Sequence, residues 1–490
     1  QVPPNLICRD LCSWNALICG FMRHGEPEKA LNVYMVMKKE HDSIHLSGHS
    51  FVLLLKACIK VKNIEIGRDI HDQIMRNSLL GQDVFLGSTV VDMYSENGEI
   101  LKAQEVFEKL SIRDIVTWTA IISACVNHGY GKEALDYFEE MQKEGISPDA
   151  STFTCTLKAC GIVKDTEKGQ ELYDYIIRIG FEKNLVVASA LVNMFVKCGW
   201  ISKAREVFDL TMDRNVVLWN TLITGYVDYG HDEEALKCFG QLQNEGISPD
   251  TVTYVCCLKS CSSMQSIHIG AEIYSEITSK GFERDVTIGN TLIDMYIKYG
   301  LLTDARHVFN SLQIRTLVSW NVLIGGYVND GNEKEIFDCL KQMANEYILP
   351  DGITFTYCLK VCGMSGAIHK VSDIHNRIIL KGFERNVSVA NSLIDAYSKC
   401  AHLAEAKETF NKILAREVIS WNILIGGYVQ HGYSDEVVEY LEKMEFEIAP
   451  DTVTFSSVLK ACSNIGAIRL GQKIHSEIYK KGFESDHFIG

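Results

Sequence analysis

Apolar residues in this chain recur three and four positions apart within segments of roughly 12 residues, and glycine follows many of these segments. This spacing places apolar side chains on one face of an α-helix, because a helix completes a turn every 3.6 residues. In one segment Trp118, Ile121, Ile122 and Cys125 form such a stripe, and Gly129 follows as a stop signal. The pattern predicts short helices joined by turns.

A second stripe follows each first one after a short polar turn. Leu135, Phe138 and Met141 form this stripe, and Gly145 and then Pro148 end it, since proline cannot continue a helix. Two helices of this length cannot bury both apolar faces alone. Each helix pair must therefore stack on its neighbours, which predicts an all-α solenoid.

The rare residues show that the helix pairs are repeats. Five of the six tryptophans are spaced by 104, 101, 101 and 101, and prolines and Leu-Lys-x-Cys cysteines follow the same rhythm. Each period divides into two longer segments and one shorter segment, as in 115–149, 150–184 and 185–215. The markers are Trp14, Trp118, Trp219, Trp320 and Trp421; Pro148, Pro249, Pro350 and Pro450; and Cys58, Cys160, Cys261, Cys362 and Cys462.

Composition and charge exclude some classes of protein and function. The chain has 490 residues, 47% of them hydrophobic. It has no apolar run as long as the ~18 residues that a membrane span needs, so none is expected. The net charge of −15 argues against bulk, sequence-blind nucleic-acid binding. However, the four later Trp-containing segments, 115–149, 216–250, 317–351 and 418–451, carry −19 between them, and the remainder of the chain is +4. Their acids follow an uncharged first helix, so we expect them on the outer face of the array.

The 17 cysteines and the absence of a Cys-x-x-Cys pair predict reduced thiols, mostly buried, in a reducing compartment.

The chain begins at Gln1, and its first ten residues lack the features of a signal or transit peptide. Neither end carries a polar capping repeat. We therefore expect a part of a longer protein.

Several segments resemble the pentatricopeptide repeat family, in particular its plant-type class of alternating P, L and S repeats. They are Val-Val-Leu-Trp-Asn-Thr-Leu-Ile at 216–223, Gly-Ile-Ser-Pro-Asp at 246–250, Asn-Thr-Leu-Ile-Asp-Met-Tyr at 290–296 and Thr-Val-Thr-Phe-Ser-Ser-Val-Leu-Lys-Ala-Cys at 452–462. The triplet of two longer segments and one shorter segment is specific to this class, and a tetratricopeptide array of uniform units fits much worse. The resemblance implies a right-handed α-solenoid superhelix.

The resemblance divides the chain into a leader, 1–10, and 14 repeats between residues 11 and 486, followed by the start of a truncated S repeat at 487–490. The P repeats are 11–47, 115–149, 216–250, 317–351 and 418–451. The L repeats are 48–83, 150–184, 251–285, 352–386 and 452–486. The S repeats are 84–114, 185–215, 286–316 and 387–417.

Such repeats resemble readers of single-stranded RNA that take one base per repeat. The family's code assigns base choice to the fifth and the last residue of each repeat, where Asn, Ser, Thr and Asp offer distinct donor and acceptor sets. A polar residue near a helix start is also an ordinary cap, but its reuse at two fixed places favours base recognition. The P pairs are Asn15/Ser47, Thr119/Asp149, Asn220/Asp250, Asn321/Asp351 and Asn422/Asp451, which resemble readers of C, G, U, U and U.

The S pairs are Ser88/Asp114, Ser189/Asn215, Asn290/Thr316 and Asn391/Glu417, which resemble readers of G, A, a pyrimidine with C favoured, and an undecided pyrimidine. The L repeats follow the code poorly. Among their pairs, Thr154/Asn184 and Thr356/Asn386 resemble A readers, and the others are Val52/Asp83, Val255/Asp285 and Ser456/Asp486. The implied target is 5′-CnGGaAUnYUaYUn-3′, with lower case for the weaker assignments.

Two further sets of residues have one functional and one ordinary interpretation. Apolar residues at the second position resemble those that pinch bases between neighbouring repeats, and packing between repeats explains them equally well. These are Val116, Val186, Val217, Val318 and Ile419. Lysines on first helices of the S repeats, Lys197, Lys298 and Lys399, are candidates for phosphate contacts, and a solvated flank is the alternative.

No catalytic site or metal site is predicted in this chain. His475-Ser476-Glu477 has the His-x-Glu spacing of a zinc deaminase, but no Pro-Cys-x-x-Cys follows it, and no cofactor is expected.

The resemblance implies a specificity factor for C-to-U RNA editing in a mitochondrion or a chloroplast, with the mitochondrion preferred. A deaminase (DYW) domain would follow Gly490 or act in trans, and multiple organellar RNA editing factor proteins could bind the L repeats. The alternative is a structural, protein-docking subunit of an organellar ribonucleoprotein or transcription complex.

Overall fold

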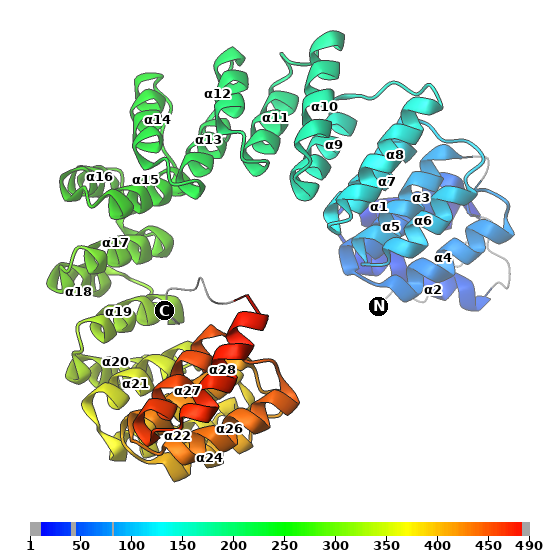
Figure 1. Ribbon diagram of the computed structural model, residues 1–490. Helices are drawn as coiled ribbons and strands as arrows, with labels where there is room; N and C mark the ends of the chain where they lie inside the picture. Colours follow the sequence, from blue (N-terminus) through cyan, green and yellow to red (C-terminus); the bar gives the residue numbers. More distant parts are fainter. Residues whose placement is uncertain (1–10, 41–45, 81–82, 483–490) are drawn as a thin grey trace. The chain divides into compact units, whose positions relative to one another are not determined.

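The computed structural model describes residues 11–40, 46–80 and 83–482, which form α-helices and two short 3-10 helices, with no strand within those ranges (Figure 1). The chain divides into two compact units, 1–256 and 257–490, and the division falls inside α15 (Thr251–Met264). Each unit consists of helix pairs in chain order. Asp486, the last four residues and the ten-residue leader lie outside the described part.

In the first unit, the first helices of the pairs are α1 (Leu11–Arg23), α3 (Gly48–Val61), α5 (Val84–Glu96), α7 (Ile115–Asn127), α9 (Ala150–Val163), α11 (Leu185–Lys197) and α13 (Val216–Asp228). The second helices are α2 (Pro27–Glu40), α4 (Ile64–Arg76), α6 (Ile100–Lys109), α8 (Gly131–Lys143), α10 (Thr166–Ile179), α12 (Ile201–Leu210) and α14 (Asp232–Asn244).

In the second unit, the first helices are α17 (Val286–Lys298), α19 (Leu317–Asn329), α21 (Gly352–Ser365), α23 (Val387–Lys399), α25 (Val418–Gln430) and α27 (Thr452–Ile465). The second helices are α16 (Ile267–Ser279), α18 (Leu302–Ser311), α20 (Glu333–Asn345), α22 (Ile368–Leu380), α24 (Leu403–Asn411), α26 (Ser434–Glu447) and α28 (Ile468–Lys480). The 3-10 helices η1 (Phe282–Arg284) and η2 (Phe383–Arg385) precede α17 and α23.

Within each unit, every first helix packs against the first helix of the next pair. Most second helices pack against the first helix before them and the first helix after them. Each pair thus buries its apolar faces against its neighbours, as a linear array requires. The prediction of an all-helical solenoid is confirmed within each unit. None of the described helices is long and apolar enough to cross a lipid bilayer.

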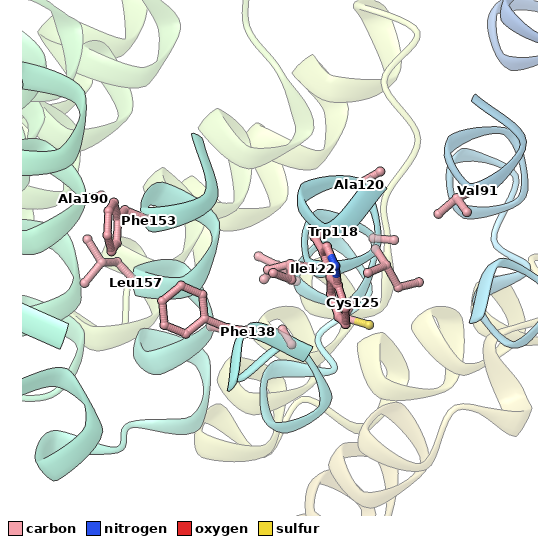
Figure 2. Close-up of a cluster of buried hydrophobic side chains, with 14 of the residues drawn as sticks. Val91, Trp118, Ala120, Ile122, Cys125, Phe138, Phe153, Leu157 and Ala190 are labelled. Atoms are coloured by element: carbon pink, nitrogen blue, oxygen red, sulfur yellow. The ribbon is translucent and has the colours of Figure 1, made fainter. Parts of the chain in front are cut away.

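The predicted apolar stripes form the core. Trp118, Ile122 and Cys125 of α7 are fully buried, and Phe138 of α8 and Phe153 of α9 continue the same cluster into the next pair (Figure 2). Burying one large apolar side chain contributes about 2–3 kcal/mol. The periodic tryptophans Trp118, Trp219, Trp320 and Trp421 are all at most 2% exposed, so the marker that reveals the repeat is a core residue.

The shorter segments of each period are short because their second helix is short. The second helices α6, α12 and α18 have 10 residues and α24 has nine, whereas most second helices elsewhere have 13 or 14. The difference is about one helical turn, and its loss keeps the apolar stripe on the same face. The uneven spacing within each period therefore reflects one deleted turn in every third pair.

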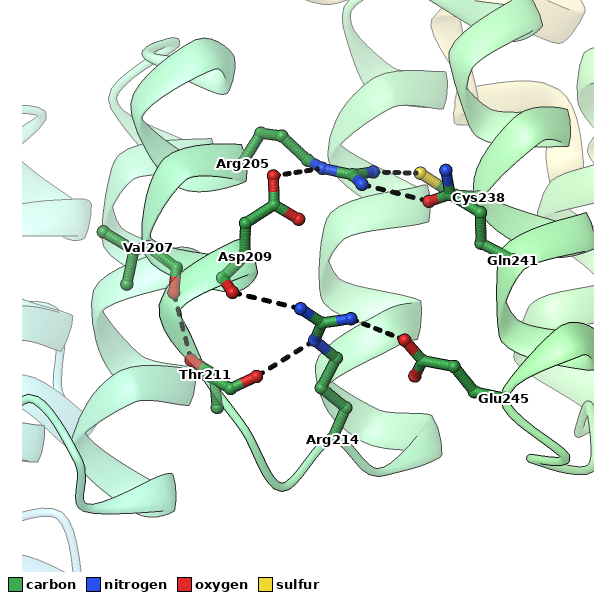
Figure 3. Close-up of polar contacts among 8 residues, drawn as sticks. All are labelled: Arg205, Val207, Asp209, Thr211, Arg214, Cys238, Gln241 and Glu245. Atoms are coloured by element: carbon green, nitrogen blue, oxygen red, sulfur yellow. Dashed lines mark hydrogen bonds and ion pairs between the residues drawn. The ribbon is translucent and has the colours of Figure 1, made fainter.

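An arginine links the end of each shortened helix to the next repeat, and Figure 3 shows this arrangement for Arg214 after α12. Arg214 donates to the carbonyl oxygens of Asp209 and Thr211 at the end of α12, and its guanidinium lies 4.8 Å from the centre of the Phe208 ring. Its third contact is an ion pair with Glu245 of the following repeat. The equivalent pairs are Arg113–Glu144, Arg315–Glu346 and Arg416–Glu447.

The Leu-Lys-x-Cys cysteines are buried, as predicted from their periodicity. Cys58, Cys160, Cys261, Cys362 and Cys462 are at most 4% exposed, and no disulfide joins the described cysteines. Burial raises the pKa of the Cys58 and Cys160 thiols to about 12. Because a thiol, not a thiolate, is present at neutral pH, these side chains act as packing residues.

Candidate nucleic-acid interface

The two predicted reading positions come together at the junction between repeats. Each described first helix begins at the first residue of a predicted repeat, so the last residue of one repeat lies at the N-cap position of the next first helix. The fifth residue lies one turn into the first helix of its own repeat. Because first helices pack side by side, the fifth residue of a repeat faces the cap that starts the next one.

The junction after the third P repeat shows this arrangement in full. The amide nitrogen Nδ2 of Asn220 donates to Oδ1 and Oδ2 of Asp250, at 2.9 and 3.0 Å. The hydroxyl of Thr253 lies 2.6 Å from Asn220 Oδ1, and the Thr253 backbone N–H donates to Asp250 Oδ1 at 3.0 Å. Asn220 is 8% exposed and Thr253 is fully buried. The two predicted reading residues therefore form one hydrogen-bonded unit with a third side chain.

The same unit recurs after the fourth and fifth P repeats. Asn321 Nδ2 donates to Asp351 Oδ1 at 3.1 Å, and Thr354 Oγ1 lies 2.7 Å from Asn321 Oδ1. Asn422 Nδ2 donates to Asp451 Oδ1 at 3.0 Å, and Thr454 Oγ1 lies 2.6 Å from Asn422 Oδ1.

Burial and hydrogen bonding act in opposite directions on these aspartates. Burial favours the neutral form of Asp250, but the backbone N–H of Thr253, the amide of Asn220 and the hydroxyl of Thr253 stabilise its carboxylate. The hydrogen bonds prevail, so the pKa of Asp250 lies below its ordinary value. The pKa values of Asp351 and Asp451 are lowered for the same reasons. Each of these three units thus presents a fixed negative charge beside a fixed amide.

The first two P repeats use the same contact with other side chains. Ser50 donates its hydroxyl to Asn15 Oδ1 at 2.6 Å, and lies 3.0 Å from the hydroxyl of Ser47. The hydroxyls of Thr119 and Thr152 are 2.7 Å apart, and Thr152 also bonds to Asp149.

The S repeats lack this link. Ser88 and Ser189 donate to backbone carbonyls of their own helices, those of Phe85 and Leu185. The buried Oδ1 atoms of Asn290 and Asn391 have no hydrogen-bond partner among the described residues. Of the last residues, Asp114, Asn215 and Thr316 cap the following helices, whereas Glu417 makes no side-chain cap.

The L repeats present the least uniform reading positions. Val52 is buried, Thr154 donates to the carbonyl of Ala150, Thr356 accepts a long contact from Ser392, and Ser456 is half-buried. The last residues Asp83, Asn184, Asp285 and Asn386 cap the next helix.

The second positions form a set of exposed apolar side chains. Val116, Val186, Val217, Val318 and Ile419 are 42, 59, 61, 59 and 59% exposed. Packing between repeats therefore leaves a large part of each side chain exposed to solvent. Further members in the same register were not among the residues predicted from sequence, namely Phe85, Val252, Ile353 and Val453, which are 48 to 61% exposed. Position within the repeat was the signal that could have found them.

The three phosphate candidates have different surroundings. Lys298 pairs with Asp294 at 2.9 Å and Lys399 with Asp395 at 2.7 Å, each one turn earlier on the same helix. Lys197 has Asn193 at that place and is exposed. Its charge is the least compensated of the three.

Family models match most of the chain. A PPR repeat family model matches residues 9–60, 113–161, 214–263, 315–364 and 416–464, and a PPR repeat model matches 88–115, 186–216, 290–315 and 388–418. The chain belongs to the PPR repeat family. The first set of matches begins near the start of each predicted P repeat, and the second falls on the S repeats.

Relatives of this PPR chain occur in Arabidopsis thaliana. A chloroplastic pentatricopeptide repeat-containing protein is 30% identical over 97% of the chain and 59% of its own length, and a mitochondrial one is 32% identical over 98% and 53%. A second chloroplastic protein is 30% identical over 93% of the chain and 74% of its own length. The chain thus spans little more than half of the first two relatives.

Solved structures share the fold. The PPR protein PPR10 in complex with an 18-nucleotide psaJ RNA element has a TM-score of 0.62 at 19% identity, over 98% of this chain and 80% of that one. A second structure, of PPR10 from maize, has a TM-score of 0.51 at 16% identity, over 98% of this chain and 85% of that one. At these identities the likeness shows the fold.

Proposed function

We propose that this PPR array binds single-stranded RNA in a sequence-specific manner, with one base per repeat. The observation that carries the proposal is the repeated unit of fifth and last residues. In three P repeats it fixes an amide and a carboxylate side by side, for example Asn220 and Asp250. Such a pair offers a donor and acceptors at one place, which is what reading a base edge requires.

The exposed second-position residues support the same proposal. An apolar side chain such as Val217 or Val318, half exposed and repeated in register, offers a surface on which a base can stack. The third and fourth P repeats thus each combine the hydrogen-bonding pair with an exposed apolar side chain. The fold is that of PPR10, which was crystallised with RNA.

The proposed target is 5′-CnGGaAUnYUaYUn-3′, and the direct test is binding of the purified chain to this RNA. A matched control RNA exchanges G and A at the bases assigned to the Thr119 and Ser189 repeats. We expect at least tenfold weaker binding to the exchanged RNA, since each wrong base leaves polar groups unpaired. Equal affinities for the two RNAs would exclude the proposed register.

We further propose that the whole protein is a specificity factor for organellar RNA processing, most directly C-to-U editing. The relatives named as chloroplastic and mitochondrial support an organellar location. In this role the array supplies binding, and a deaminase beyond Gly490 or in trans supplies the chemistry, with zinc as its metal. Loss of the protein should abolish editing of a cytidine next to the bound sequence, while unrelated sites stay edited. Sequencing of organellar transcripts from a disrupted line tests this, and unchanged editing at every site would rule it out.

A further inference from the structure

We propose that Thr253, Thr354 and Thr454, each the third residue of its L repeat, are positioning residues for the base readers in the P repeats before them. In Thr253, Thr354 and Thr454 the hydroxyl holds the amide of Asn220, Asn321 or Asn422 in one of its two orientations. The inference deepens the proposed function, because it assumes that these asparagines read bases.

The direction of the hydroxyl proton follows from its neighbours. The backbone N–H of Asp250 donates to Thr253 Oγ1 at 3.2 Å, which occupies an acceptor site on that oxygen. The Thr253 proton then points away, and the shortest acceptor is Asn220 Oδ1 at 2.6 Å, while Asp250 Oδ1 is at 3.0 Å. Asp351 and Asp451 donate to Thr354 and Thr454 in the same way. The threonine therefore fixes where the oxygen of the amide lies.

A fixed amide presents a defined group to the base. With Oδ1 bound to threonine and one Nδ2 hydrogen bound to aspartate, the second Nδ2 hydrogen is left to donate. A donor suits the carbonyl oxygen of uracil, whereas a rotated amide would present an oxygen and suit the amino group of cytosine. Holding the amide thus favours U over C at these three repeats.

The threonines can act on RNA only through the proposed reading residues that they contact. Thr253, Thr354 and Thr454 are fully buried, so they offer RNA no surface. The other junctions serve as an internal comparison. At the start of the S repeats the third residue is apolar, as in Val187 and Ile288, so it has no hydroxyl to hold the preceding reader. At the junction after the last S repeat the third residue is Ser420, but Ser420 Oγ and Asn391 Oδ1 are both without hydrogen-bond partners in the described structure.

The test replaces the hydroxyl by a methyl group of similar size. In the triple variant Thr253→Val, Thr354→Val, Thr454→Val, the backbone N–H groups that cap the aspartates remain. We measure the affinity for the target RNA and for an RNA with C in place of U at these three bases. We expect the ratio of the two affinities to fall about threefold to tenfold per position, as the loss of one hydrogen bond implies. A Thr→Ser triple variant, which keeps the hydroxyl, should retain the wild-type ratio.

Thr156→Val is the matched control, because Thr156 is also fully buried and donates only to the carbonyl of Thr152. Its U-to-C ratio should equal that of the wild type. If the valine variant does not fold, judged by circular dichroism, a Thr→Ala triple variant removes the hydroxyl without crowding. If the wild-type protein binds the RNAs with U and with C at these three bases equally well, the proposed function itself is wrong. A wild type that prefers U, together with folded valine or alanine variants that prefer it equally, would overturn the positioning role alone.

Discussion

Arg214 and Glu245 belong to different repeats, and their side chains form an ion pair at 2.5 Å. The arginine also stacks on Phe208 and binds the last carbonyl oxygens of α12. A side chain with three kinds of partner joins the short S repeat to the P repeat after it. The same pairing at four junctions makes it a regular part of the array.

Removing this arginine should loosen one junction. We expect Arg214→Ala to destabilise α12 to α14 by about 1–2 kcal/mol, because a partly buried ion pair, helix-end hydrogen bonds and a cation–π contact are lost together. Hydrogen exchange of amides in these helices measures the effect locally, as suits a repeat array. Lys237→Ala removes an exposed pair with Glu233 and should leave exchange unchanged. If the amides of α12 to α14 exchange at the same rate in Arg214→Ala as in Lys237→Ala, the stability of the junction does not depend on Arg214.

Changing one last residue should change one base. The Thr119 and Asp149 pair is assigned to G, and Asp149→Asn should move the preference of that repeat from G toward A, because the amide adds a donor where the carboxylate only accepts. Binding to RNAs that differ only at this base measures the change. Asn at the cap still accepts the Thr152 N–H bond, so the fold should be kept. An unchanged preference would count against Asp149 as a reader.

The exposed second-position residues should matter for RNA but not for folding. Val217 and Val318 are 61 and 59% exposed, so replacing both by alanine should leave the thermal midpoint within a few degrees. Affinity for the target RNA should fall about threefold to tenfold, as one apolar contact is reduced at each of two bases. The buried Leu222→Ala is the contrasting variant, and it should destabilise the chain by about 2–5 kcal/mol. Full RNA affinity in the double valine variant would contradict base stacking at these positions.

The lysines of the S repeats should differ in their contribution to phosphate binding. Lys197→Ala should weaken RNA binding and reduce the slope of log affinity against log salt by about 0.7, as expected for one single-strand phosphate contact. Lys298→Ala should have a smaller effect, because Asp294 already compensates that charge. Titration at several salt concentrations tests both. A slope unchanged in both variants would assign these lysines to a solvated flank.

The aspartates of the P repeats should make stability depend on pH in acid. Since the folded state lowers the pKa of Asp250, Asp351 and Asp451, their contribution is fully present above the unfolded value of about 3.9 and is lost as pH falls through the folded pKa. The urea midpoint of the wild type should fall below about pH 4. In an Asp→Asn triple variant the decline should be shallower. If the urea midpoint falls with pH equally steeply in the wild type and the variant, these carboxylates are not the source of the pH dependence.

The repeat, the helix pairs and the candidate reading residues follow from the sequence. Trp118 and Phe138 are spaced as core residues of helices are, and the period of 101 places every repeat start where a helix begins. Local periodicity specifies such features because a solenoid is built from neighbours in the chain. The fifth and last residues were chosen from a resemblance, and their use as readers stays a prediction.

Contacts between polar residues of different repeats were decided by tertiary structure. The resemblance pairs Asn220 with Asp250 as readers of one base, but the hydrogen bonds between them, and the inclusion of Thr253, follow from the packing of one first helix on the next. By contrast, the carboxylates beside Lys298 and Lys399 lie four residues earlier on the same helix, so local helical spacing already places them there. Periodicity determines which face of a helix is buried. The polar groups that meet across a junction depend on how the helices pack, and only the folded chain shows this packing.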